Sequence, residues 1–222
     1  MVDYAKARAT MVDCQVRTVD VTEYPVLDAF SAVPREEFVP DALKPLAYID
    51  EDLLVSAPGA APRHLMEPGP LARLVQLAQI MPTDRVLDLG SASGYSAAIL
   101  ATLAAHVTGV EPDAALAASA SATLARLGHD NVTIMAGPLA AGHAAGAPYD
   151  VILFEGAIEL LPDVIADQLA DGGRIVAVVG SNSLAGKATI FTRSGRTVSG
   201  RPAFNTHVRP LPEFVRPKAF VF

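Results

Sequence analysis

The stretch VLDLGSASGY, residues 86–95, holds the residue types most suited to chemistry in this chain. An apolar run containing Asp88 leads into a loop of small residues, which opens onto a helix-like pattern. A loop of this kind brings the main chain close to a ligand, because small side chains leave little bulk between the two. Its middle position holds Ala92. The spacing of the flanking glycines must therefore indicate which ligand is bound.

That spacing separates two classes of ligand. A dinucleotide fingerprint has glycines at positions one, three and six, which here hold Gly90, Ala92 and Tyr95. A tyrosine where helix and strand must approach closely argues against NAD or FAD. Positions one, three and five hold Gly90, Ala92 and Gly94, a spacing typical of Rossmann-like methyltransferases. The loop therefore favours S-adenosylmethionine.

Two carboxylates stand where that cofactor needs acceptors. Asp88 is placed to meet the ammonium of its amino-acid end, and Glu111 follows Gly90 by twenty-one residues, as a ribose ligand would. Ionised carboxylates accept well from two hydroxyls. Taken one at a time, a tight turn and a helix-start carboxylate explain these residues equally well. Together they predict cofactor contacts from Asp88, Gly90, Ser91, Ala92, Ser93, Gly94 and Glu111.

Alternating strand-like and helix-like segments would position these residues. The predicted strands are RVLDLG, HVTGVE, NVTIMAG, YDVILFEG and RIVAVVG, and the predicted helices are YSAAILATLA, PDAALAASASATLARLG and LPDVIADQLADGG. The segment KATIFTRSGRTVSGRPAF predicts an antiparallel hairpin turning at Ser194-Gly195. This order predicts an α/β fold of the Rossmann-like methyltransferase class, with a mostly parallel, doubly wound sheet and a C-terminal antiparallel hairpin.

The first 67 residues differ in pattern. The segment VTEYPVLDAFSAVPREEF has the apolar spacing of an amphipathic helix, and the proline- and glycine-rich SAPGAAPRHLMEPGP follows it. The apolar side of the predicted helix comprises Val26, Leu27, Phe30 and Val33. We expect residues 1–67 to form a helical cap and substrate loop, and residues 68–222 to form the methyltransferase domain, in one compact unit. We expect Phe220 and Phe222 to pack along a sheet edge.

Composition narrows the class of protein. A net charge of −7 and a pI near 5.1 leave no basic area for non-specific nucleic-acid binding. The single cysteine, Cys14, suits a reducing compartment, and the N-terminus has no signal-peptide core. The five histidines have no zinc-like spacing, so we expect no metal. These features predict a cytoplasmic protein that is not bound to a membrane.

Three longer blocks resemble one family, the protein-L-isoaspartate O-methyltransferases. VLDAFSAVPREEFVPDALKPLAYIDEDL resembles its N-terminal signature, VLDLGSASGYSAAILATLAAHVTGVE its cofactor loop, and APYDVILFEGAIELLPDVIADQLADGGRIVAVVG its fourth-to-fifth-strand segment. The resemblance covers nearly the whole chain. It implies a cytoplasmic repair enzyme that transfers the methyl group of S-adenosylmethionine to the α-carboxyl group of isoaspartyl residues in damaged proteins.

The chain departs from the family's pattern in three places. The family's loop before the first helix of the domain reads roughly Q-T-I-S-x-P, and its hydroxyls contact the reacting centre. Aligned on Pro68, this chain reads RHLMEP, so His64 stands for the threonine and Met66 for the serine. Ala92 replaces the middle glycine of the cofactor loop. Pro138 takes the place of the aspartate that meets the adenine amine, and it offers neither a side-chain acceptor nor a backbone donor. The resemblance implies further cofactor contacts at Tyr95, which follows Gly94 in the family's Gly-Tyr pair, and at Gly137 and Pro138.

These departures bear on selectivity more than on the reaction itself. A carboxylate is already ionised at neutral pH, so methyl transfer to it needs no strong base and gains most from proximity. His64 is a candidate donor to the substrate carboxylate or else an exposed loop residue. Glu67 is a candidate partner for an ammonium or else a residue that caps the next helix. Met66 is expected to pack against the cofactor or the cap.

Three functions remain open from the sequence. The first is carboxyl methylation of the isoaspartyl-repair type, and the second is methylation of a small-molecule carboxylate. The third is a non-catalytic relative that binds an adenosyl ligand or a protein partner. The sequence does not determine the oligomeric state.

Overall fold

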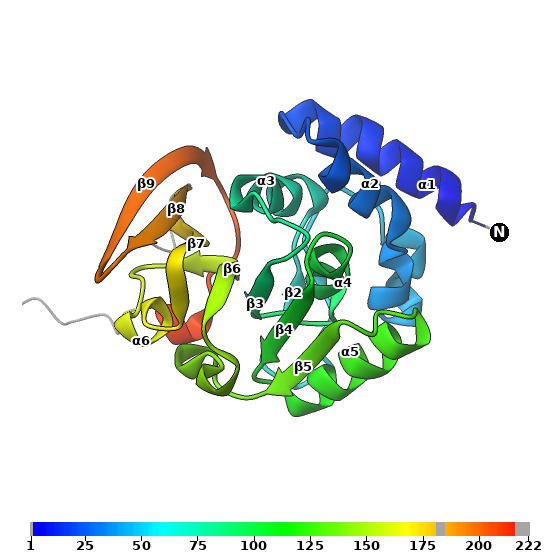
Figure 1. Ribbon diagram of the computed structural model, residues 1–222. Coiled ribbons are helices and arrows are strands. Elements are labelled where there is room, and N and C mark those ends of the chain that lie inside the picture. Colours follow the sequence, from blue (N-terminus) through cyan, green and yellow to red (C-terminus); the bar gives the residue numbers. More distant parts are fainter. Residues whose placement is uncertain (1, 181–184, 216–222) are drawn as a thin grey trace, which may run out of the picture.

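The computed structural model describes residues 2–180 and 185–215. Within them, seven strands form one sheet in the order β5-β4-β3-β6-β7-β8-β9, with helices on both faces (Figure 1). The strands are β3 Arg85–Leu89, β4 His106–Glu111, β5 Val132–Ala136, β6 Tyr149–Ile158, β7 Leu169–Val179, β8 Gly186–Ser194 and β9 Thr197–Thr206. The first five are mutually parallel, and β8 and β9 pair antiparallel. The predicted Rossmann-like class and the predicted hairpin are both confirmed.

The strand order fixes where a ligand can bind. The chain runs from β3 outward through β4 to β5 and then returns to the other side of β3 with β6. The connections therefore diverge between β3 and β6, and in open parallel sheets ligands bind beyond the carboxyl ends of the strands at such a point. The loop of residues 90–94 follows β3 at that end. The fold thus places the glycine loop, residues 90–94, at the carboxyl end of β3, beside the point where the connections diverge.

The three predicted helices form as α4 Tyr95–Ala101, α5 Ala114–Arg126 and α6 Asp163–Ala166, and a further helix, α3 Pro68–Ala78, precedes them. The helix predicted over LPDVIADQLADGG was wrong in length, because α6 has only 4 residues and β7 already begins at Leu169. Tertiary contacts end it: the Gln168 side chain bonds the main chain of His143 and Ala141, and the Gln168 carbonyl accepts from the amide of Tyr149. These bonds draw the chain into the sheet.

The N-terminal residues form a layer of short helices. They are α1 Tyr4–Met11, the π-helical η1 Val12–Val16, the 3₁₀ turns η2 Arg17–Val19, η3 Arg35–Phe38 and η4 Asp41–Leu46, and α2 Tyr24–Ala32. The helix α2 contacts α3 and α4, as Figure 1 shows. The four apolar residues predicted on one side of this region are all buried. A two-stranded antiparallel ribbon, β1 Leu53–Leu54 and β2 His64–Leu65, follows.

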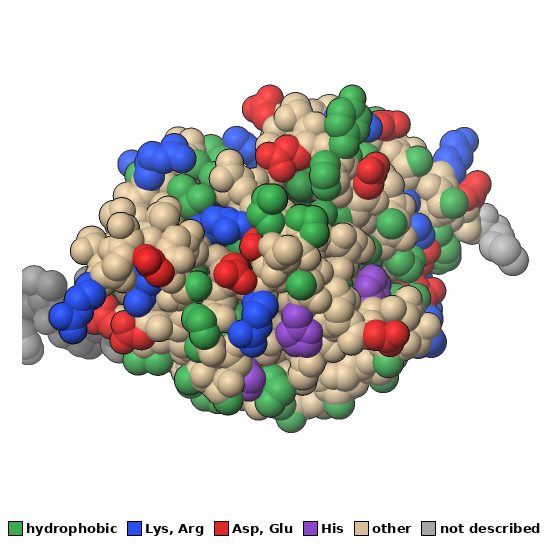
Figure 2. Space-filling model, in the orientation of Figure 1, with side chains coloured by type: hydrophobic (Ala, Val, Ile, Leu, Met, Phe, Trp, Pro, Cys, Tyr) green, Lys and Arg blue, Asp and Glu red, His purple; other side chains and the backbone are tan. Residues whose placement is uncertain are grey.

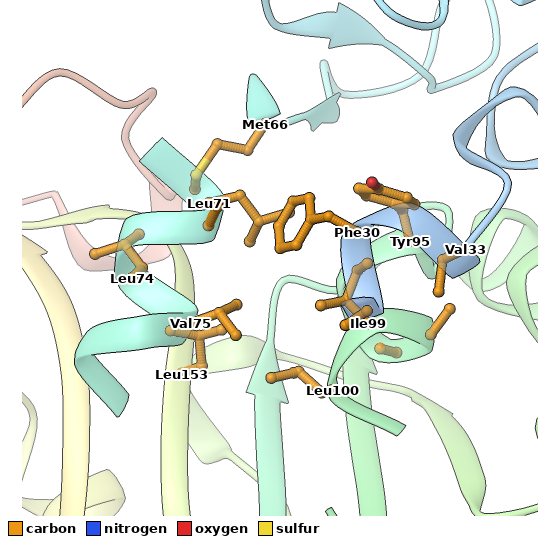
Figure 3. Close-up of a cluster of buried hydrophobic side chains, with 14 of the residues drawn as sticks. Phe30, Val33, Met66, Leu71, Leu74, Val75, Tyr95, Ile99, Leu100 and Leu153 are labelled. Carbon is orange, nitrogen blue, oxygen red and sulfur yellow. The ribbon is translucent and has the colours of Figure 1, made fainter. Parts of the chain in front are cut away.

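The core joins this layer to the methyltransferase fold (Figure 3). The ring of Tyr95 lies edge-on to Phe30, at 6.2 Å between centroids, and to Phe38, at 5.7 Å. Met66 reaches into the same cluster toward Leu71. Edge-to-face aromatic pairs add stabilisation beyond the area they bury. The residues before α3 are therefore part of one hydrophobic core with the sheet's helices.

Two further observations concern the surface. In Figure 2, acidic and basic side chains are interspersed on the face shown and form no continuous basic area there. Among the residues that the structure describes, no helix is long and apolar enough to cross a membrane. The predicted packing of Phe220 and Phe222 lies outside the described residues.

Candidate active site

The glycine loop turns through three positive φ angles. Gly90 has φ +92°, Ala92 +47° and Gly94 +93°. A left-handed conformation costs a residue with a Cβ about 1–2 kcal/mol relative to glycine, so Ala92 is strained. Its amide donates to Oε2 of Glu111 at 2.9 Å, which offsets part of that strain. The amide of Gly90 is fixed by a 2.9 Å bond to the carbonyl of Val110. The loop is thus tied to the end of β4.

Asp88 is fully buried on β3, directly before this loop. One carboxylate oxygen, Oδ2, accepts from the hydroxyl of Ser96 at 2.8 Å, and the other, Oδ1, is buried without a hydrogen-bond partner. Burial raises the pKa of Asp88 to about 7 against the effect of the Ser96 hydrogen bond, and the nearby Glu111 raises it further. An unpartnered buried carboxylate oxygen is a binding site for a cation or a hydrogen-bond donor.

Glu111, at the end of β4, is also fully buried but is completely bonded. Its oxygens accept from the amides of Ala92, at 2.9 Å, and Asp113, at 3.2 Å. They also accept from Arg63, whose Nε lies at 3.0 and 3.2 Å and whose Nη2 lies at 2.9 Å. Nη2 of Arg63 donates in addition to the carbonyl of Gly90 at 3.0 Å. The predicted ribose ligand is therefore paired with an arginine that the sequence did not indicate.

A third carboxylate, Glu155 on β6, completes the group. Its Oε1 is buried without a partner, and burial together with the charge of Asp88 raises its pKa well above the usual value. A Cβ placed on Gly90 would lie 3.0 Å from Nη2 of Arg63 and 3.6 Å from Cβ of Glu155. Glu155 was also missed. The signal that could have found it is an acidic residue directly after the apolar run VILF, in the strand beside the switch point.

The predicted substrate loop is the second strand of the β1–β2 ribbon. His64 is partly buried, and burial, followed by the charge of Arg209, lowers its pKa, which favours the neutral imidazole at pH 7. Met66 is buried in the hydrophobic core, so the expected packing role is confirmed. The amide of Glu67 donates to Asp52 at 2.9 Å, and Asp52 also accepts from Arg209 at 3.0 Å. Charged groups therefore surround His64.

The segment predicted to meet the adenine, around Pro138, differs from the family's pattern. The amide of Gly137 donates to the main-chain carbonyl of Glu111 at 3.1 Å. Pro138 precedes a 3₁₀ turn, η5 Leu139–Ala141, whose first two amides each donate to the carboxylate of Glu213 at 3.1 Å. A carboxylate from the C-terminal part of the chain thus lies beside Pro138. Nothing in the spacing of the sequence pointed to it.

The C-terminal segment, residues 208–214, covers this end of the sheet. The amide of Ala157 donates to the carbonyl of Arg209 at 2.8 Å, and the amide of Leu211 donates to the carbonyl of Ala157 at 2.9 Å. Cδ2 of Leu211 lies 3.1 Å from the position of a Cβ on Gly90. The segment therefore closes over the glycine loop.

The fold gathers most of the predicted cofactor residues at one place. Asp88, the loop of residues 90–94, Glu111 and Gly137 are linked through neighbouring strand ends. The hydroxyl oxygens of Ser91 and Ser93 are buried without partners among the described residues. Tyr95 instead points its ring into the core. The arrangement presents buried carboxyl groups around a small-residue loop, and a cationic, hydroxyl-bearing ligand would favour their ionised forms.

Comparison with known proteins supports this interpretation. A family model described as Protein-L-isoaspartate(D-aspartate) O-methyltransferase (PCMT) matches residues 7–208. The chain is 39% identical over 193 residues to the protein-L-isoaspartate O-methyltransferase of Koribacter versatilis, covering 87% of this chain and 85% of that protein. It is 38% identical over 195 residues to the protein of the same name from Roseiflexus castenholzii, covering 88% and 85%.

Solved structures agree on the fold. A structure named protein-L-isoaspartate O-methyltransferase superposes with a TM-score of 0.80 at 24% identity, covering 92% of this chain and 65% of that one. A Plasmodium falciparum structure described as a β-aspartate methyltransferase, in complex with S-adenosyl-L-homocysteine, gives 0.76 at 18% identity and covers 95% and 99%. The chain therefore belongs to the protein-L-isoaspartate(D-aspartate) O-methyltransferase family, whose cofactor is S-adenosylmethionine.

Proposed function

We propose that this protein methylates the α-carboxyl group of isoaspartyl residues in damaged proteins, with Asp88 and Glu111 as its principal cofactor ligands. The observation that carries the proposal is the charge of the site. Asp88, Glu111 and Glu155 bring three carboxyl groups together around one guanidinium, that of Arg63. A cofactor bearing a sulfonium and an ammonium supplies the missing positive charge, whereas a dinucleotide would bring further negative charge.

The residues fit S-adenosylmethionine on one condition. Asp88 has a buried oxygen without a partner, which suits the ammonium, and the loop of residues 90–94 carries only small side chains. Glu111 suits the ribose hydroxyls by its place at the end of β4. It must first give up Arg63, because its oxygens are already fully engaged.

Methyl transfer to a carboxylate requires little from the protein beyond positioning of the two reactants. When bound, S-adenosylmethionine supplies a methyl group on a sulfonium, and the acceptor carboxylate becomes a methyl ester as neutral S-adenosylhomocysteine is released. The attacking oxygen is ionised, so no side chain has to remove a proton. Holding the carboxylate in line with the methyl group is worth up to about 7–11 kcal/mol in favourable cases. We assign this orientation to the β1–β2 ribbon, with His64 as a hydrogen-bond donor.

The domain bounds, the cellular location and the partners are further parts of this proposal. We propose residues 1–67 as the cap and substrate loop, and residues 68–222 as the methyltransferase domain. We also propose a cytoplasmic location, isoaspartyl proteins as substrates, and no nucleic-acid partner, given the charge of −7.

One observation favours a second candidate function. Met66 stands in place of the family's hydroxyl residue and is buried in the core, so this ribbon has lost a hydrogen-bond donor to the isoaspartyl carboxylate. A site so altered could accept a small-molecule carboxylate instead.

The test is methyl incorporation from labelled S-adenosylmethionine into an isoaspartyl peptide, with the matching aspartyl peptide as control. We expect incorporation into the isoaspartyl peptide alone. Incorporation into neither peptide, by a protein that binds S-adenosylhomocysteine, would contradict the repair function and favour the small-molecule candidate.

A further inference from the structure

We infer that Arg63 serves two anions in turn: it pairs with Glu111 before the cofactor binds, and with the α-carboxylate of the methyl acceptor afterwards. This inference rests on the proposed function for the identity of the acceptor. It makes Arg63 the group that links the cofactor site to the acceptor site.

The first step follows from the capacity of Glu111. A carboxylate has two oxygens and about four lone-pair positions. Five contacts already reach them, three from Arg63 and two from the amides of Ala92 and Asp113. The two amides belong to the glycine loop and to the N-cap of α5, so the main-chain structure holds them beside Glu111. Ribose hydroxyls can therefore bind Glu111 only if Arg63 departs.

The second step follows from what holds Arg63. Its amide donates to the hydroxyl of Ser56 at 3.1 Å, and its carbonyl accepts from the amides of Val55 at 2.9 Å and Ser56 at 3.4 Å. These bonds close the ribbon and fix the main chain. Only the side chain is free to move, and it extends from the residue next to His64. A displaced guanidinium therefore remains at the acceptor side of the site.

The third step is electrostatic. A guanidinium stays charged when buried, so an anion at its new position stabilises the displaced side chain of Arg63. The acceptor brings a carboxylate, which a guanidinium binds through two parallel hydrogen bonds and so orients as well as holds. Met66 supplies no donor there. Arg63 would thus replace the hydroxyl that the family's loop provides, and cofactor would bind before acceptor.

Glu155 is the alternative partner for the guanidinium of Arg63 once that group has left Glu111. Its Oε1 is buried without a partner, and its Cβ lies near the same Gly90 position as Nη2 of Arg63. If Arg63 moved to Glu155, it would be unavailable to the acceptor, and the two ligands would bind independently. The two destinations therefore predict different coupling between cofactor binding and acceptor binding, and this coupling can be measured.

The test measures binding without relying on turnover. Titrate an isoaspartyl peptide into the wild-type protein with and without saturating S-adenosylhomocysteine. We expect the product to tighten peptide binding by about tenfold, within the usual range of coupling between two sites. In Arg63→Gln, the coupling should vanish, and S-adenosylhomocysteine should bind about threefold more tightly because no guanidinium competes for Glu111. Arg63→Lys keeps the charge without the paired donors and should retain part of the coupling.

The control is Arg126→Gln, which removes an exposed arginine paired with Glu37 and should leave every constant unchanged. Thermal unfolding checks that each variant is folded. Equal peptide affinity with and without the product, in the wild-type protein, would overturn the inference. So would weaker product binding in both Arg63 variants, which would make Arg63 a structural support of Glu111. Failure of the wild type to methylate the isoaspartyl peptide is a separate result, which bears on the proposed function alone.

Discussion

Nη2 of Arg35, in the N-terminal layer, donates to the main-chain carbonyl of Met66 at 2.8 Å. Nε of the same side chain donates to the carbonyl of Ala47 at 2.8 Å, and the guanidinium lies 4.9 Å from the ring centre of Tyr95. The arginine is fully buried, which lowers its pKa. One side chain therefore joins the cap, the substrate loop and the start of α4.

Replacing this arginine should disturb the substrate loop before the cofactor site. We expect Arg35→Met to lower the free energy of unfolding by about 2–4 kcal/mol, because two buried carbonyls lose their donors. The KM for an isoaspartyl peptide should rise while the Kd for S-adenosylhomocysteine stays within about twofold. Urea unfolding and steady-state kinetics measure the two effects. Arg17→Gln, at an exposed helix pair, is the control, with a change below about 0.5 kcal/mol.

The raised pKa of Asp88 predicts how stability depends on pH. Because the folded-state value of about 7 lies above the ordinary 3.8, the folded protein holds a proton that the unfolded chain releases. Stability from this group is complete below pH 3.8 and is lost as pH rises to 7. Asp88→Asn should therefore be more stable than the wild type at pH 8, by a few kcal/mol, and equal to it near the ordinary pKa.

The same variant should bind the cofactor poorly. Loss of the ionised partner of the ammonium should weaken binding of S-adenosylhomocysteine by about 1.5–3 kcal/mol. Calorimetric titration and chemical unfolding across pH measure both effects. A variant that is less stable than the wild type at pH 8 would show that Asp88 is ionised and favourably paired in the folded protein.

Glu111 should prove essential for the ribose. Glu111→Gln is expected to weaken S-adenosylhomocysteine binding by about 1.5–3 kcal/mol, as for a charged hydrogen bond. The variant also leaves Arg63 without its anion, so the double variant Arg63→Gln, Glu111→Gln separates ligand contact from this side effect. Unchanged affinity in both folded variants would remove Glu111 from the ribose site.

Two substitutions in the substrate loop should change turnover in opposite directions. His64→Ala should lower turnover on an isoaspartyl peptide, because it removes a candidate donor, while cofactor affinity stays near that of the wild type. Met66→Ser restores a hydroxyl and should raise turnover. The smaller side chain also leaves a cavity in the core, so the free energy of unfolding should fall by about 2–4 kcal/mol. If both variants match the wild type in rate, the loop does not hold the substrate carboxylate.

The proline at 138 predicts loose discrimination at the adenine amine. With no carboxylate from that position, the inosyl analogue of S-adenosylhomocysteine should lose less than about 3 kcal/mol of binding relative to the adenosyl compound. Competitive titration gives the difference. A larger loss would reveal a strong acceptor, and Glu213, which already binds the amides of Leu139 and Ala140, would be the first residue to substitute.

The strands and the glycine loop could be predicted because their information is local. Apolar runs such as residues 85–89 mark buried strands, and the spacing from Gly90 to Glu111 spans one strand-helix-strand unit. The pairing of Arg63 with Glu111 could not be predicted in this way, because it joins residues 48 positions apart through tertiary packing. Helix α6 was overestimated for the same reason, since the bonds of Gln168 override its local propensity.

The cover that residues 208–214 form over the glycine loop has a consequence for biosynthesis. A ribosome makes the chain from its N-terminus, so Gly90, Glu111 and Glu155 emerge well before Leu211, which packs beside Gly90. Until then, Ala157 of β6 lacks its main-chain hydrogen bonds with Arg209 and Leu211. The nascent chain therefore leaves the glycine loop uncovered. The cover over the glycine loop therefore forms after the strands that carry the cofactor ligands have been made.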